Sequence, residues 1–179
     1  MQRLLNTQGK LIGIDFGDKR TGLAVCDKNR IIASGIGQIS VGGMQKTAAR
    51  ICEIIKDEGI TGGVVVGLPI NMDGSHGPRA EHAEKFARIL GELLAADEKT
   101  ASLPIVMVDE RMTTMVAARY LNETDTRGSK RKQVIDTLSA QIILQNAIDR
   151  LKKHGMIPPR KDIYNGKRKI RLANSGICI

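Results

Sequence analysis

Aromatic residues are nearly absent from this chain of 179 residues, where they make up 2% of the sequence and tryptophan does not occur. Many modules that bind single-stranded RNA stack bases on aromatic rings. The composition therefore argues against a recognition surface of that kind. Apolar residues still make up 41%, which is ordinary for a globular protein and sufficient for one domain with an aliphatic core.

Cysteine and long apolar runs are also sparse. Cys26, Cys52 and Cys178 are odd in number, far apart and outside any CxxC pattern, which argues against a disulfide scaffold and a zinc site. No run approaches eighteen apolar residues, and the N-terminus lacks the apolar core of a signal peptide. We expect a cytoplasmic protein with no membrane partner.

One sign of charge dominates the chain. The formal net charge is +9 and the pI is about 9.7, and much of the surplus is clustered after Pro158. Clustered basic residues favour a nucleic-acid partner, although charge that only confers solubility is the alternative. We expect residues 1–154 to form one domain and residues 155–179 a basic, flexible tail.

The hydrophobic pattern predicts alternating strands and helices. We expect strands at 10–16, 22–26, 30–39, 63–69 and 104–109, and helices at 45–58, 78–96, 113–122 and 133–153. This order predicts an α/β protein with a mixed central sheet and helices on both faces, which is the order of the ribonuclease H-like fold. The expected inner faces are Ala83, Phe86, Ile89, Leu90 and Leu93 on the second helix, and Val134, Leu138, Ile142 and Ile148 on the last.

Acidic residues occur where these elements begin or end. Asp15 ends the first strand, Asp109 and Glu110 end the last one, and Asp136 is expected in the first turn of the long helix. At an effective dielectric of about 20, two unit charges 4 Å apart repel by about 4 kcal/mol. Mg²⁺ (or Mn²⁺), a hard cation that takes carboxylate oxygens, relieves such repulsion and supports phosphodiester hydrolysis.

Each acid also has a simpler interpretation when it is taken alone. Asp15 could bond the amides of the turn that follows it, Asp136 could be a helix N-terminal acid favoured by the macrodipole, and Glu110 could pair with Arg20 or Arg111 at the surface. Sequence spacing does not show that the acids meet.

Basic and amide side chains near these acids are candidate phosphate contacts. They are Arg20, Asn71, Lys130, Arg131 and Lys132. The last three fall in a stretch, 124–132, that we expect to be a flexible basic loop, and a solvated charge run is its alternative interpretation. Asn71 lies in a polar loop that could instead make only turn hydrogen bonds.

Four segments of the chain resemble the motifs of one family. They are GIDFGDKRTGLAV at 13–25, VGLPINMDGSHGP at 66–78, VDERMTT at 108–114 and KRKQVIDTLSAQIILQ at 130–145. In this order they resemble the YqgF (also RuvX) family of Holliday-junction-resolvase-like proteins and pre-16S rRNA nucleases. The resemblance covers about residues 10 to 150, and Ser139 stands where the family often has alanine.

The resemblance implies a ribonuclease H-like, metal-dependent nuclease in the cytoplasm that matures the 5′ end of precursor small-subunit (16S) rRNA. By motif position it makes Asp15, Glu110 and Asp136 the catalytic and metal-binding residues, with Asp109 as an uncertain neighbour. Precursor rRNA, and possibly a whole ribosomal particle, would be the partner. The oligomeric state stays open.

Three other functions are consistent with parts of the sequence. A Holliday junction resolvase acting on branched DNA would use the same chemistry, and a non-catalytic nucleic-acid-binding factor would use only the basic surface. An actin-like ATPase shares the Asp15-Phe16-Gly17 hairpin pattern, but such enzymes need two lobes and this chain supplies one.

Deleting residues 156–179 should weaken the salt dependence of RNA binding. Neutralising about six phosphates gives a slope of about −4 in a plot of log affinity against log salt concentration on single strands. Titrations of full-length and truncated protein in several salt concentrations measure it. An unchanged slope would place the phosphate contacts on the domain instead.

Overall fold

The computed structural model describes residues 1–109 and 129–153, with side chains from Asp136 onward in the second range. The elements are α1 (Gln2–Leu5), β1 (Leu11–Phe16), β2 (Thr21–Cys26), β3 (Ala33–Ile39), α2 (Met44–Asp57), β4 (Gly63–Leu68), α3 (Pro78–Ala95), β5 (Ile105–Asp109) and α5 (Ser129–Lys153). The helix expected at 113–122 and the tail from 155 lie outside these ranges. Among the described helices, none is both long and apolar enough to cross a membrane.

Five strands form one mixed sheet in the order β3-β2-β1-β4-β5. The meander β1-β2-β3 is antiparallel, while β4 runs parallel to β1 and β5 runs parallel to β4. The continuous apolar run of β4 matches its burial on both faces, as parallel strands require. The predicted sheet is confirmed.

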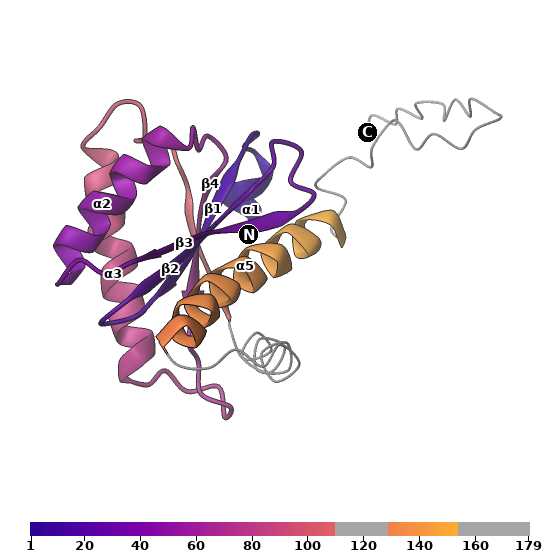
Figure 1. The fold of residues 1–179 in the computed structure, drawn as a ribbon. Helices are drawn as coiled ribbons and strands as arrows, with labels where there is room; N and C mark the ends of the chain where they lie inside the picture. Colours follow the sequence, from indigo (N-terminus) through magenta and orange to yellow (C-terminus); the bar gives the residue numbers. More distant parts are fainter. Residues whose placement is uncertain (110–128, 154–179) are drawn as a thin grey trace, which may run out of the picture.

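Helices cover both faces of this sheet, with α5 on one face and α2 and α3 on the other (Figure 1). Alternation along β1 sends Ile12 and Ile14 into the core under α2 and α3, and Leu11 into the core under α5. Phe16 lies on the same side of β1 as Ile12 and Ile14, and it stacks on Phe86 of α3 with ring centroids 4.1 Å apart. Helices on both faces were predicted and are confirmed.

The inner faces of the helices differ in part from the prediction. Leu93 of α3 is exposed, and Leu94 is buried in its place. On α5, Leu138 and Ile142 are only half-buried, because the helix turns a neighbouring stripe toward the sheet. That stripe consists of Ala140, Ile143, Leu144, Ala147, Ile148 and Leu151. Alanines on this stripe allow the closer approach.

Helix α5 begins earlier than expected. The sequence predicted a basic loop to Lys132, yet the helix starts at Ser129 and includes Lys130 and Arg131. Lysine and arginine are good helix formers, and neither glycine nor proline follows before Lys153. The helix therefore extends upstream through the basic residues. Asp136 consequently lies two turns inside the helix, not in its first turn.

Side chains of α5 also hold the edge of the sheet. Gln145 Oε1 accepts a hydrogen bond from the backbone N–H of Ala33 at 2.8 Å, and Gln141 Nε2 donates to the Ala33 carbonyl at 3.0 Å. These bonds occupy backbone groups of the edge strand β3 and fix the position of α5 along the sheet.

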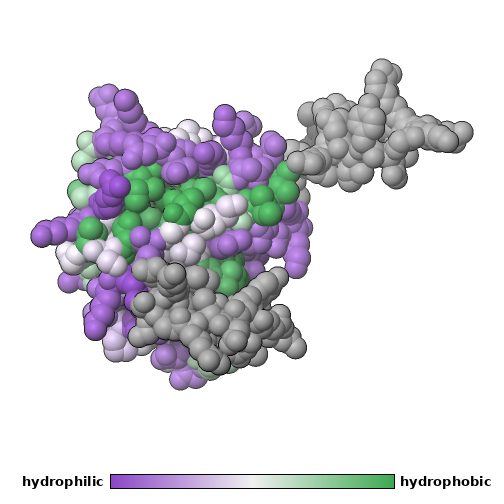
Figure 2. Space-filling model, in the orientation of Figure 1, coloured by the Kyte–Doolittle hydropathy of each residue, from purple (hydrophilic) through white to green (hydrophobic). Residues whose placement is uncertain are grey.

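The face of the molecule seen in Figure 1 is drawn as a surface in Figure 2, which shows hydrophobic residues in a band bordered by hydrophilic ones.

Glycines make room for α5 where it crosses the strands. A Cβ at Gly13 would lie 2.7 Å from the Leu144 Cβ, and one at Gly22 would overlap the carbonyl oxygen of Asp136. The helix backbone therefore rests on β2 next to Asp15, because Gly22 is the cross-strand partner of Asp15.

Gly22→Ala should destabilise the fold by about 3 kcal/mol, because the added methyl group meets helix backbone that has no room to shift. Gly91→Ala in α3 is the matched control: its Cβ would make an ordinary contact with Ile105 at 3.5 Å, and alanine in a helix should stabilise by about 0.5–1 kcal/mol. Urea denaturation of both variants measures these changes. Equal stability of the two variants would contradict the close packing of α5 on Gly22.

Candidate acidic active site

The alternation of β1 that points Leu11 and Gly13 toward α5 points Asp15 the same way. Gly13 faces Ala140 and Leu144 of α5. The step from Gly13 to Asp15 covers about 6.6 Å along the strand, and the step from Ala140 back to Asp136 covers about 6 Å along the helix. Because α5 runs antiparallel to β1, these two steps go in the same direction. Asp15 therefore faces the turn of α5 that carries Asp136.

Burial and three neighbouring side chains set the pKa of the Asp15 carboxyl group. Burial between β1 and α5 removes water from this carboxyl group, and this loss of water, together with the nearby Asp136 charge, raises the pKa of Asp15 to about 6. The Arg79 guanidinium and a hydrogen bond with Ser139 act in the opposite direction. The structure thus brings Asp15 and Asp136 into one electrostatic environment.

The simpler interpretation of Asp136 is ruled out by its place in the helix. Macrodipole stabilisation falls off within the first turn, and Asp136 lies seven residues beyond Ser129. Its Oδ2 lies 2.8 Å from Arg20 Nε. Both atoms are buried and neither has a hydrogen bond of acceptable geometry in the described part of the chain, so this contact is a charge–charge pair.

Arg20, expected to contact substrate, is therefore engaged with Asp136 in this structure. Asn71 is also engaged: its Nδ2 donates to Ser75 Oγ at 2.9 Å. Ser75 Oγ in turn donates to Asp73 at 2.6 Å, and His76 Nδ1 lies 2.9 Å from Glu84 Oε1 of α3. The loop between β4 and α3 is thus held in shape by its own side chains and attached to α3.

The other predicted site residues are placed less completely. Glu110 lies outside the described residues, as do the side chains of Lys130, Arg131 and Lys132. Asp109 ends β5 opposite Leu68. Alternation assigns it to the set of Ile105 and Met107, which pack under α2 and α3, whereas Asp15 belongs to the opposite face.

Ser139 and Arg79 lie near Asp15 but are not among the predicted site residues. Ser139 is a small residue that stands where the family often has alanine, and its hydroxyl hydrogen-bonds Asp15. Its spacing of three residues from Asp136, on the same helix face, is the signal that could have identified it. Arg79 follows Pro78 at the start of α3, and no spacing in the sequence connects it with Asp15.

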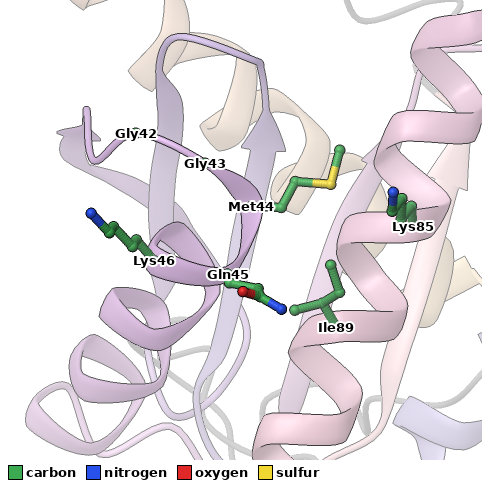
Figure 3. A pocket seen from close by; sticks show the side chains of 7 residues that line it. All are labelled: Gly42, Gly43, Met44, Gln45, Lys46, Lys85 and Ile89. Atoms are coloured by element: carbon green, nitrogen blue, oxygen red, sulfur yellow. The ribbon is translucent and has the colours of Figure 1, made fainter.

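A separate hollow of about 420 Å³ lies between the start of α2 and the side of α3. Figure 3 shows Met44 and Ile89 on its two walls, with Lys46 pointing away from both. These residues belong to the α2 and α3 side of the sheet, whereas the Asp15 carboxyl group points toward α5. This hollow is therefore distinct from the acidic site.

The donor set of the acidic site fits a hard divalent cation. Carboxylate oxygens are the ligands such ions prefer, and a cation would offset the repulsion that raises the Asp15 pKa. No cluster of three or more His, Cys, Asp or Glu side chains suited to a metal occurs in the described ranges. These ranges supply two carboxylates, so further donors would come from other residues or from water.

A family model described as "RuvX: Holliday junction resolvase" matches residues 9–150. The chain belongs to the RuvX family. A relative from Cereibacter sphaeroides is 44% identical over 147 residues, covering 82% of this chain and 87% of the relative. One from Ruminiclostridium cellulolyticum is 38% identical over 143 residues, covering 79% of this chain and 95% of the relative. Both carry the name "Putative pre-16S rRNA nuclease".

A solved structure, T. thermophilus RuvC in complex with Holliday junction substrate, matches with a TM-score of 0.50 at 17% identity. The match covers 83% of this chain and 97% of that one. This likeness concerns the fold alone and confirms the predicted ribonuclease H-like arrangement. The RuvX match spans Asp15, Glu110 and Asp136 and ends before the basic tail.

Without divalent metal, the stability of the RuvX fold should fall as pH rises through about 6. The Asp15 pKa in the folded protein lies above the ordinary aspartate value of 3.8, so folding favours the protonated acid and loses that advantage as Asp15 ionises. Asp15→Asn should therefore exceed wild type in stability by up to about 3 kcal/mol at neutral pH, with the difference vanishing near pH 4.

Urea denaturation in EDTA between about pH 4 and pH 8 measures this difference. Asp57→Asn, an identical change at an exposed position, is the control and should show no such pH-dependent gain. Parallel stability curves for wild type and Asp15→Asn would contradict the raised pKa.

Proposed function

We propose that this protein is a metal-dependent nuclease that matures the 5′ end of precursor 16S rRNA in the cytoplasm. The observation that carries the proposal is the juxtaposition of Asp15 with Asp136 across the β1–α5 contact. Burial of Asp15 there, together with the Asp136 charge, raises the pKa of Asp15. Burying clustered carboxylates costs free energy unless they coordinate a cation, and such clusters are typical of functional sites.

Asp15 and Asp136, together with Glu110, are the proposed ligands for Mg²⁺ or Mn²⁺. A metal ion bound there would activate water and stabilise the leaving oxygen. The chain itself supplies the rigid placement of the acids: β1 fixes Asp15, Ser139 orients it, and Gly22 lets α5 hold Asp136 beside it. Asp109 is left out of the proposed set, because alternation assigns it to the other face of the sheet.

Precursor rRNA is proposed as the substrate because relatives 38% and 44% identical carry that activity in their names. The basic net charge of +9 favours a polyanionic substrate, whether RNA or DNA. Branched DNA is the alternative substrate, supported by the description of the family model. The fold is compatible with both, so substrate choice has to be measured.

Asp15→Asn should lower the rate of metal-dependent RNA cleavage by about a hundredfold or more. Loss of a charged ligand forfeits several kcal/mol of transition-state stabilisation, and each 1.4 kcal/mol corresponds to about a factor of ten. Asp136→Asn should act in the same direction, and Asp57→Asn at the far end of α2 should leave the rate unchanged.

The assay uses labelled RNA that carries a 5′-extended small-subunit rRNA end, with Mg²⁺ or with EDTA. The same RNA assembled in ribosomal particles and a four-way DNA junction are tested in parallel. Cleavage of the RNA that EDTA and Asp15→Asn abolish supports the proposal. Cleavage of the junction alone would shift the substrate to DNA, and the absence of cleavage on every substrate would favour a binding factor.

A further inference from the structure

Arg79 is a basic residue beside the acidic site for which the proposed chemistry has so far given no role. It lies in the first turn of α3, directly after Pro78. Its side chain is exposed, and it acts electrostatically on the Asp15 carboxyl group. Helix α3 begins after β4, at the edge of the sheet where β1 and β5 also end.

The geometry of α3 carries Arg79 out over that edge. Arg79, His82 and Phe86 are spaced i, i+3 and i+7, so they share one face of the helix. Phe86 stacks on Phe16, the residue after Asp15. His82 Nδ1 lies 3.1 Å from Asp18 Oδ1 in the turn that follows β1. Arg79 continues this line by about one further turn, roughly 5 Å beyond His82.

Arg79 differs from Arg20 in the partner available to it. Arg20 is paired with Asp136 at 2.8 Å. Within the described residues, no carboxylate forms an ion pair with Arg79. Arginine presents five donors in a planar fork that matches phosphate. The helix dipole adds a favourable field for an anion at the first turn of α3, where Gly77 contributes no side-chain cap and Glu81 places one negative charge.

We propose that Arg79 binds a backbone phosphate of the RNA substrate and so places the scissile phosphodiester against Asp15 and Asp136. This inference rests on the proposed nuclease function and adds a substrate-binding residue to it. The alternative is that Arg79 only balances the charge of Asp15. In that case its removal would change the acidic site without weakening RNA binding in the absence of metal.

RNA binding in EDTA separates these two roles, because no cleavage occurs and no metal contributes. Fluorescence anisotropy with a labelled 5′-extended rRNA oligonucleotide gives Kd over a series of KCl concentrations. The variants are Arg79→Gln, Arg79→Lys and the matched control Arg88→Gln. Arg88 is also exposed on α3, and nine residues place it about 180° around the helix from Arg79.

Arg79→Gln should raise Kd about tenfold and reduce the salt slope by about 0.7, the value for one phosphate contact on a single strand. Arg79→Lys should keep the slope with a smaller loss of affinity, because a lysine retains the charge but not the bidentate geometry. Arg88→Gln should change neither quantity. Thermal denaturation of all three variants should match wild type, since both arginines are exposed.

Two results would overturn the inference, and they are distinguishable. If wild type binds and cleaves the RNA while Arg79→Gln matches Arg88→Gln in Kd and salt slope, Arg79 does not bind substrate and the nuclease function stands. If wild type neither binds nor cleaves the RNA, the proposed function fails and this inference fails with it.

Discussion

The close contact of α5 with β2 at Gly22 is the constraint on which the acidic site depends. Only a residue without a side chain lets the helix backbone at Asp136 rest on the strand beside Asp15. Two acids that are far apart in the sequence are thereby held in one half-buried environment. The cost appears as the raised pKa of Asp15, and a cation at the site would remove that cost.

Neighbouring polar and charged side chains partly offset the electrostatic cost of holding the two acids together. Arg20 pairs with Asp136, while Ser139 and Arg79 act on Asp15. Ser139 and Arg79 favour the ionised form of Asp15, yet they leave the Asp15 pKa well above its usual range. The protein therefore neutralises the charge of the site only in part. A divalent ion would stabilise the acids further, and Arg79 would bind a phosphate.

Much of the fold could be predicted because its signals are local. The apolar runs of β1, β4 and β5 and the periodicity of α2 and α3 identify the elements, and their order identifies the sheet. Asp15 and Asp136 could be chosen because strand ends and family motifs mark them. Leu93, Leu138 and Ile142 were placed wrongly, because helix periodicity alone does not say which of two adjacent apolar stripes meets the sheet.

The remaining features depend on contacts between distant segments. The start of α5 at Ser129 reflects helix propensity in a charged stretch whose composition predicts a loop. The pairing of Arg20 with Asp136 and the approach of Arg79 to Asp15 arise only after β1, α3 and α5 are packed together. No spacing in the sequence carries that information. The position of Ser139 three residues after Asp136, on the same helix face, is by contrast a signal that the sequence does carry.

We propose that Asp15 and Asp136 bind one cation between them. Anomalous scattering from crystals of the protein soaked in Mn²⁺ locates such an ion independently of any activity. We expect an anomalous peak in contact with both carboxylates, absent in crystals of Asp136→Asn treated in the same way. A peak elsewhere, or ordered carboxylates with no ion between them, would contradict it.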